Sequence, residues 1–193
     1  MLTVYIDFKS PASYLAINPV LALVERHGIV LEWKAFRSSE REVPTITDNP
    51  LVANMHWGVR AASRRTIHQK YASHQGINLQ FPASAGNTDL ALGALALISG
   101  DPLSFINAAF AAYWTDHADL NDPTVIAHLI SETIGENFVF DEKTCIDALE
   151  SSQAEAEELG IVDAPAFIIQ DQLFIGREHL PWIEEIKIDG EYR

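Results

Sequence analysis

Two strands and an intervening helix are predicted at the start of the chain from its hydrophobic pattern. Residues 2–8 are rich in β-branched and aromatic side chains, which is typical of a buried strand. Ser10 is a favoured N-cap and Pro11 a favoured first helical residue, so a helix is expected from there to His27-Gly28. A second strand is expected over residues 29–36. This order predicts two parallel strands joined by a right-handed crossover.

The middle of the chain has a helical pattern that is interrupted at Gly and Pro clusters. A polar, proline-containing stretch at residues 37–51 comes first. Asp101-Pro102 and Asp122-Pro123 each place an Asp at an N-cap position and a Pro at the first helical position. Residues 144–159 predict a helix with a solvated face of Glu side chains. Several helices of ordinary length are therefore expected here.

The chain ends with a predicted hairpin and a last helix. Residues 166–170 and 173–175 flank Asp171-Gln172 like two strands, and a helix is expected from about Glu178 to Ile186. The whole order predicts an α/β domain that is interrupted by a helical insertion. We expect residues 1–37 and 160–193 to form the α/β part. Residues 38–159 are expected to form the insertion and its connecting helices.

Composition and charge narrow the possible functions. The 193 residues carry a net charge of −14, divided into +3 over residues 1–70 and −17 over residues 71–193, which disfavours binding to nucleic acid or to an anionic membrane. Cys145 is the only cysteine, so a disulfide within the chain, a C-x-x-C pair and a multi-cysteine metal site are excluded. The seven histidines show no metal-ligand spacing. No secretory signal or membrane span is recognisable, so we expect a cytoplasmic protein.

Two short segments carry the candidate chemistry. Ser10 lies where a strand passes into a helix, beside unpaired backbone N–H groups that favour an anion or a thiolate. An N-cap role alone is the more frequent reason for a serine at such a position. Pro165 directly precedes the apolar strand of the hairpin. A strand that simply begins with proline is the ordinary explanation for it, because cis X-Pro bonds are uncommon.

Taken together, the two segments resemble one family. The stretch Asp7-Phe8-Lys9-Ser10-Pro11-Ala12-Ser13-Tyr14-Leu15-Ala16 is similar to the active-site segment of 2-hydroxychromene-2-carboxylate isomerases and kappa-class glutathione transferases, which are DsbA-type members of the thioredoxin superfamily. The similarity continues through Phe81-Pro82, residues 121–123 and residues 160–167 to residues 173–176, so it covers nearly the whole chain. It implies a thioredoxin-like fold of DsbA type, interrupted by an all-helical insertion.

The resemblance also implies roles for individual residues. Ser10 would replace the nucleophilic cysteine of redox relatives and hydrogen-bond the sulfur of glutathione, while Ser13 would take the resolving position. Pro165 would be a cis-proline, and the backbone of Ala164 would pair with the main chain of glutathione. The other glutathione contacts that the resemblance implies are Pro11, Asn49, Arg177 and Glu178.

The activity implied by the resemblance is a glutathione-dependent isomerisation of a small conjugated or aromatic acid. Bound glutathione thiolate would add reversibly to a conjugated double bond, with Ser10 as a positioning donor. A kappa-like glutathione transferase and a non-redox module that binds a peptide or partner at the cis-proline are the alternatives. The single cysteine argues against a dithiol oxidoreductase. Members of the family are commonly dimers, so a homodimer is expected.

A basic cluster lies outside these motifs. It contains Arg60, Arg64, Arg65, His68 and Lys70. The spacing of Arg60, Arg64 and His68 places them on one face of a predicted helix. A solvated surface is the ordinary explanation for such a face. Attraction of a substrate carboxylate is the functional one.

Overall fold

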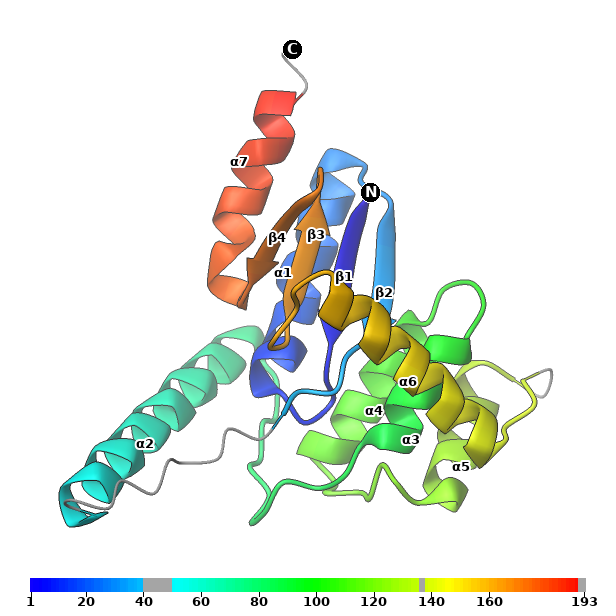
Figure 1. Cartoon of the computed structure of the whole chain (residues 1–193), viewed down its shortest axis with the longest axis horizontal. Coiled ribbons are helices and arrows are strands. Elements are labelled where there is room, and N and C mark those ends of the chain that lie inside the picture. Colours follow the sequence, from blue (N-terminus) through cyan, green and yellow to red (C-terminus); the bar gives the residue numbers. More distant parts are fainter. Residues whose placement is uncertain (40–49, 136–137, 191–193) are drawn as a thin grey trace.

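A four-stranded mixed sheet forms the centre of the molecule (Figure 1). The computed structural model describes residues 1–39, 50–135 and 138–190. The strand order is β2-β1-β3-β4. Strand β1 (Leu2–Ile6) pairs in parallel with β2 (Leu31–Ala35) and antiparallel with β3 (Ala166–Ile169), and β3 pairs antiparallel with β4 (Gln172–Ile175). All five residues of β1 are buried, as expected of an apolar strand with a neighbour on both sides.

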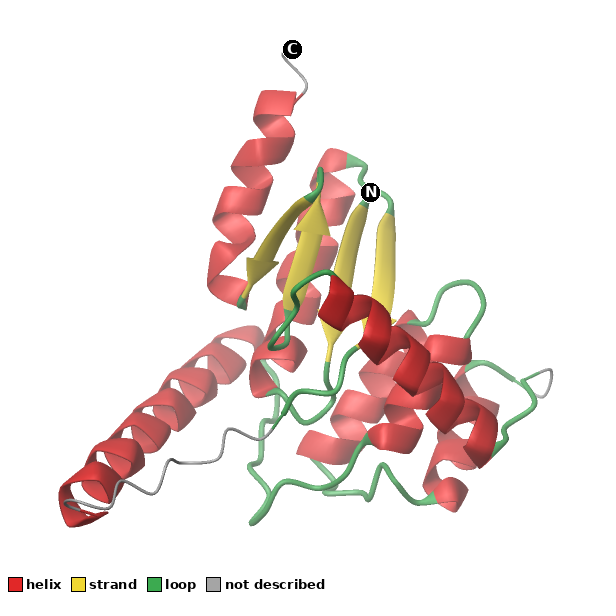
Figure 2. Cartoon of the chain, viewed as in Figure 1, coloured by secondary structure: helices red, strands yellow, loops and turns green. Residues whose placement is uncertain are grey.

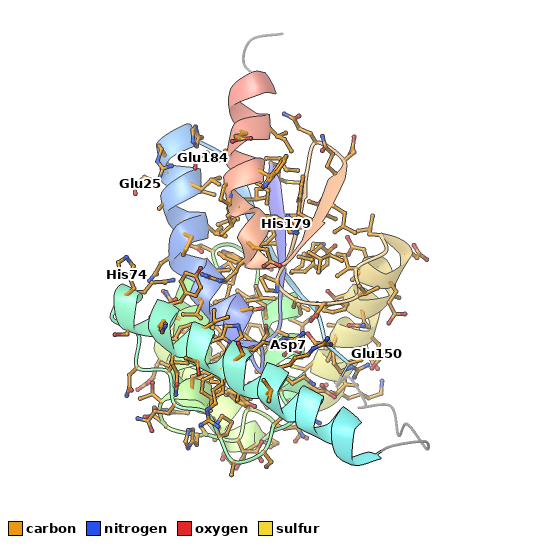
Figure 3. All side chains as sticks on the ribbon, turned by 90° about the vertical axis from the view of Figure 1, so that its left-hand side faces the viewer. Asp7, Glu25, His74, Glu150, His179 and Glu184 are labelled. Carbon is orange, nitrogen blue, oxygen red and sulfur yellow. The ribbon has the colours of Figure 1, made fainter. Side chains whose placement is uncertain are left out.

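Two helices cover one face of this sheet. Helix α1 (Pro11–His27) connects β1 to β2 and ends at Gly28, whose φ of 61° is the left-handed conformation that glycine adopts at helix C-termini. Helix α7 (Leu180–Gly190) lies alongside α1, where Glu184 accepts a 2.9 Å hydrogen bond from His27 (Figure 3). The predicted start of this last helix near Glu178 is wrong. Residues Arg177–His179 form a short 3₁₀ turn, η1, and the α-helix begins one residue before Pro181, a residue suited to a first turn.

The predicted helical insertion is confirmed, and four of its helices group together at one end of the sheet (Figures 1 and 2). They are α3 (Asp89–Leu97), α4 (Leu103–Trp114), α5 (Pro123–Thr133) and α6 (Glu142–Glu158). Asp122 caps α5 as expected, whereas the N-cap of α4 is Pro102, because Asp101 lies one residue further out and accepts the N–H of Leu103.

Helices α3 and α6 cross at very short range. A Cβ on Gly93 would lie 2.2 Å from the carbonyl oxygen of Cys145, so any larger residue would separate the two backbones. The Cys145 side chain is fully buried at this crossing. Burial also raises the pKa of its thiol, so it is protonated and has a packing role.

Helix α2 (Pro50–Gln75) projects away from the other helices (Figure 2). Its C-terminal end is attached to α1, because the Gln75 side chain donates a 3.0 Å hydrogen bond to the carbonyl of Leu15. Four members of the basic cluster, Arg60, Arg64, Arg65 and Lys70, are exposed on it, whereas His68 is half-buried. In the described part of the chain, no helix combines the length and the apolar character needed to cross a membrane.

A second, smaller apolar cluster positions the segment before β3. Tyr5 on β1 and Ala156 on α6 pack with Ile161 and Ala164 on the opposite face of the sheet from α1. The Tyr5 hydroxyl approaches Glu155 at 3.5 Å, and burial with this carboxylate raises the pKa of Tyr5 to about 12. The loop that carries Ala164 is therefore held by the core on one side.

Candidate active site

The Ser10 side chain connects the two halves of the predicted site. Its oxygen accepts a 3.2 Å hydrogen bond from the N–H of Ser13, which makes Ser10 the N-cap of α1. Its hydroxyl donates a 2.9 Å hydrogen bond to the carbonyl of Ala164. The Ala164–Pro165 bond is cis, as the family resemblance implies. The structure thus brings Ser10, Ala164 and Pro165 together at the N-terminus of a helix.

The buried side chain of Asp7 stabilises the turn between β1 and α1. Asp7 is fully buried, and its oxygens accept hydrogen bonds from the N–H of Lys9 at 3.1 Å, the N–H of Ser38 at 2.9 Å and the hydroxyl of Thr88 at 3.2 Å. Burial raises the pKa of Asp7, while Lys9 and the hydrogen bonds from Ser38 oppose that rise. Asp7, which is labelled in Figure 3, therefore connects the turn before Ser10 to the segments that carry Ser38 and Thr88.

Ser13 and Pro11 shape the start of α1. The Ser13 side chain is fully buried and accepts a 3.4 Å hydrogen bond from the N–H of Asp7, so it points into the protein. Pro11 is the first residue of the helix. The Trp114 indole donates a 2.9 Å hydrogen bond to the carbonyl of Phe8 and fixes the turn on its other side. Direct contact of Ser13 or Pro11 with a ligand stays a prediction.

The segment after β4 contacts the cis-proline, Pro165. The N–H of Gly176 donates a 2.8 Å hydrogen bond to the carbonyl of Pro165. Gly176 has a φ of 102°, and a Cβ here would lie 2.5 Å from a carboxylate oxygen of Glu178, which folds back over it. The N–H of Ala164 donates a 2.9 Å hydrogen bond to the Asp163 carboxylate. The bond between Gly176 and Pro165 thus holds Arg177 and Glu178 close to the Ala164–Pro165 segment, which Ser10 contacts.

Arg177 also meets the basic face of α2. Its guanidinium lies 3.5 Å from the centroid of the Tyr71 ring, a cation–π arrangement. Burial lowers the pKa of His68, and the positive charges of Arg177 and Arg64 lower it further. This face of α2 is therefore more than an isolated solvated surface. The role of Tyr71 is missed by the sequence reasoning above, although it follows His68 by three residues and shares its helix face.

Other predicted residues lie outside this arrangement. Asn49 falls outside the described residues, so its implied contact with glutathione stays a prediction. Within residues 1–39, 50–135 and 138–190, no three His, Cys, Asp or Glu side chains gather as a metal site would require. Asp7 and Trp114 are the supporting residues that the sequence reasoning leaves without a role. The strand-terminal position of Asp7 is the one local signal for it.

A βαβ unit followed by a ββα unit, with a cis-proline opposite the N-terminus of the first helix, defines a thioredoxin-type protein. The family model described as a DSBA-like thioredoxin domain matches residues 1–186. The chain belongs to this family.

Relatives of known activity and solved structures agree with this assignment. A 2-hydroxychromene-2-carboxylate isomerase of Sphingobium xenophagum is 25% identical, with 96% of each chain covered. A solved structure of a 2-hydroxychromene-2-carboxylate isomerase superposes with a TM-score of 0.71 at 20% identity, covering 96% of this chain and 93% of the other. The cytosolic disulfide reductase DsbM of Pseudomonas aeruginosa, solved with GSH, gives a TM-score of 0.57 at 15% identity, covering 99% and 97%. The fold is therefore DsbA-like, and the relatives include isomerases.

Proposed function

We propose that this protein is a glutathione-dependent isomerase that acts on a small conjugated acid, with an activity like that of 2-hydroxychromene-2-carboxylate isomerase. The observation that carries the proposal is the position of the Ser10 hydroxyl. It lies at the N-terminus of α1 and 2.9 Å from the carbonyl that precedes the cis-proline. The named isomerase relatives and the DsbA-like neighbour solved with GSH support the choice of reaction and of cofactor.

The residues at the site suit the chemical groups of glutathione. The sulfur needs a hydrogen-bond donor, which Ser10 offers, and the tripeptide backbone needs an extended partner, which the Ala164 backbone beside Pro165 offers. Its carboxylates need cations, and Arg177 is the cation next to Gly176. The Ala164 N–H is bonded to Asp163, so this carboxylate must turn away when a peptide main chain pairs there.

The chain's own residues would favour a thiolate. A free thiol with a pKa of about 8.5 is mostly protonated at neutral pH. The Ser10 hydroxyl can rotate from the Ala164 carbonyl to a sulfur, and the hydrogen bond that it accepts from Ser13 strengthens it as a donor. The positive end of the α1 dipole adds to this effect. Bound glutathione supplies a thiolate that adds reversibly to a conjugated double bond and so permits rotation about it.

The charge around the site suits an acidic substrate. Arg177 and Arg64 bring two positive charges close enough to His68 to lower its pKa. Tyr71, beneath the Arg177 guanidinium, offers an aromatic surface at the same place. A flat conjugated carboxylic acid can contact both kinds of group. This location for the substrate carboxylate gives the basic face of α2 its proposed role.

Isothermal titration with glutathione tests the cofactor. We expect binding by the wild-type protein and a loss of about tenfold or more in affinity for Ser10→Ala, since a charge-assisted hydrogen bond is worth about 1.5–3 kcal/mol. Ser131→Ala is the matched control, because the exposed Ser131 hydroxyl donates its hydrogen bond within α5, to the carbonyl of His128. Absence of any heat at millimolar glutathione would contradict the proposal.

A separate assay distinguishes the alternatives at the same site. Conjugation of glutathione to an electrophile with no isomerisation would indicate a kappa-like transferase. Binding of extended peptides without any thiol, again with no isomerisation, would indicate a partner-binding module. The single cysteine, Cys145, is buried in α6, so we expect no reduction of insulin disulfides.

A further inference from the structure

The outer edge of β2 carries backbone groups that the sheet leaves unpaired. Strand β2 is one of the two edge strands. Its ladder with β1 is flanked by two hydrogen bonds, from the Leu2 N–H to the Val30 carbonyl at 2.8 Å and from the Phe36 N–H to the Ile6 carbonyl at 2.9 Å. In a parallel ladder, alternate residues face the neighbouring strand, so the even-numbered residues of β2 face β1. Leu31, Trp33 and Ala35 therefore direct their N–H and C=O groups outward.

One contact confirms this direction. The hydroxyl of Ser152, on α6, donates a 2.7 Å hydrogen bond to the outward carbonyl of Ala35. Within the parts of the chain that the structure describes, no other group bonds the outward amides and carbonyls of Leu31 and Trp33. Both residues are only partly exposed. An edge of this kind can accept a further strand.

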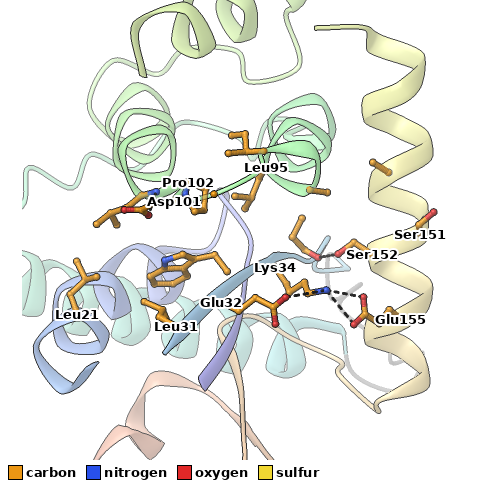
Figure 4. A pocket seen from close by; sticks show the side chains of 17 residues that line it. Leu21, Leu31, Glu32, Lys34, Leu95, Asp101, Pro102, Ser151, Ser152 and Glu155 are labelled. Carbon is orange, nitrogen blue, oxygen red and sulfur yellow. Dashed lines mark hydrogen bonds and ion pairs between the residues drawn. The ribbon is translucent and has the colours of Figure 1, made fainter. Parts of the chain in front are cut away.

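A groove of about 890 Å³ runs along this edge (Figure 4). We call it the β2 groove. Its lining comes from β2, from α6, from the α3–α4 connection with the adjoining helix ends, and from Leu21 on α1. Leu21, Leu31 and Pro102 lie on one side of β2, and Lys34 and Glu155 lie on the other, as Figure 4 shows. One wall is therefore mainly apolar and the opposite wall is charged.

The charged wall is acidic overall. The Lys34 ammonium lies 3.2 Å from the Glu155 carboxylate and 3.6 Å from that of Glu32, so one cation is shared by two anions. Asp101, which lies beside Pro102 on the opposite side of the groove, adds a third carboxylate to the lining (Figure 4). A cationic side chain brought to this wall gains an attractive interaction, whereas an anionic one is repelled.

We propose that the β2 groove binds an extended, basic segment of another protein by strand addition to β2. Successive side chains of a strand point to opposite faces, so a segment that alternates apolar and Lys or Arg residues matches both walls at once. The unpaired groups of Leu31 and Trp33 supply the main-chain hydrogen bonds. A second copy of this chain fits poorly, because its own β2 is recessed between α6 and the α3–α4 connection.

Fluorescence anisotropy with a labelled nine-residue peptide of alternating Val and Lys tests the proposal. We expect saturable binding, and about tenfold or more weaker binding by Glu155→Lys, which reverses the charge of the groove wall. Glu155→Gln should give an intermediate loss. Glu158→Lys makes the same charge change on the same helix outside the groove lining, so it should bind like the wild type. A Val-Glu peptide and a backbone N-methylated Val-Lys peptide should fail to bind.

Amide NMR spectra locate the peptide. We expect the Leu31, Trp33 and Ala35 amides to shift on binding and to gain protection from hydrogen exchange. No saturable binding at millimolar peptide would overturn the proposal, and so would binding that Glu155→Lys leaves unchanged. Perturbation confined to the Ser10 and Pro165 region would also overturn it. A dimer that Glu155→Lys dissociates, with no peptide binding, would assign the groove to a second copy instead.

Discussion

The Ser10 hydroxyl donates a hydrogen bond of 2.9 Å to the carbonyl of Ala164, 154 positions later in the chain. This bond connects the first helix of the βαβ unit to the residue before the cis-proline of the ββα unit. The same hydroxyl is the donor that a thiolate would need. In the proposed function, glutathione binding would exchange one hydrogen bond of this hydroxyl for a charge-assisted one.

Removal of the Ser10 hydroxyl should destabilise the protein moderately. Ser10→Ala loses the N-cap of α1 and the bond to Ala164, so we expect the free energy of unfolding to fall by about 1–2 kcal/mol. Ser10→Thr retains the capping oxygen and should lose less. Urea denaturation measures both variants. Equal stability of Ser10→Ala and the wild type would show that this bond contributes nothing in solution.

The pKa of His68 should report the approach of Arg177 to α2. Burial is the largest cause of its lowered pKa, followed by the charges of Arg177 and Arg64. We expect Arg177→Gln to raise the pKa of His68 part of the way toward about 6.5, because burial persists. An NMR titration of the imidazole follows this. Arg26→Gln, which removes a cation paired with Glu184, is the control, and a His68 pKa that is the same in all three proteins would refute the contact.

Stability should depend on pH through Asp7. Burial raises the pKa of Asp7 in the folded state above its value in the unfolded chain, which is about 3.9. The folded protein therefore retains a proton that the unfolded chain releases between these two values. The stability that Asp7 contributes is fully present below about pH 3.9 and is lost as the pH rises through the folded-state pKa.

Comparison with Asp7→Asn isolates this effect. The variant also loses the acceptor for the Ser38 N–H, but that loss does not vary with pH. We expect the free energy of unfolding of the wild type to fall relative to that of Asp7→Asn as the pH rises above about 4 toward the folded-state pKa of Asp7, because the unfolded chain releases its proton first. Chemical denaturation at several pH values measures the difference. A constant difference would mean that the pKa of Asp7 is not raised.

Two glycine substitutions should change stability in opposite directions. A Cβ on Gly93 would lie 2.2 Å from the Cys145 carbonyl oxygen, which is backbone and cannot move aside without separating α3 from α6. We expect Gly93→Ala to cost about 1–3 kcal/mol or more. Gly58 lies in α2 with open space around it, so Gly58→Ala should stabilise by up to about 1 kcal/mol. Thermal unfolding checks both, and a neutral Gly93→Ala would contradict the close crossing.

Local patterns were sufficient to predict the first part of the fold. The apolar run of β1 and the Ser10-Pro11 pair determine where the strand ends and where α1 begins, because capping depends on adjacent residues. The hairpin β3–β4 is also predicted, from its two apolar runs, but its turn lies at Gln170 and Asp171 rather than at Asp171-Gln172, because Gln172 is the first residue of β4. The start of α7 was misplaced, since a 3₁₀ turn and an α-helical turn differ little in local composition.

The site could be predicted only in part. Ser10 and Pro165 emerged as a pair through the family resemblance, because spacing alone does not identify a cis bond. The contacts of Arg177 with Tyr71 and of Asp7 with Thr88 join residues far apart in the chain, and no periodic pattern encodes them. The spacing of Arg64 and His68 predicts that they share a helix face, but their proximity to Arg177 cannot be predicted from that spacing.

In the proposed function, glutathione held at Ser10 is required for isomerisation. The most direct measurement is the ultraviolet change of 2-hydroxychromene-2-carboxylate with purified protein, in the presence and absence of glutathione. We expect isomerisation that needs glutathione and that falls by about 100-fold or more in Ser10→Ala, with Ser131→Ala unaffected. The same rate without any thiol, or no isomerisation with saturating glutathione, would contradict it.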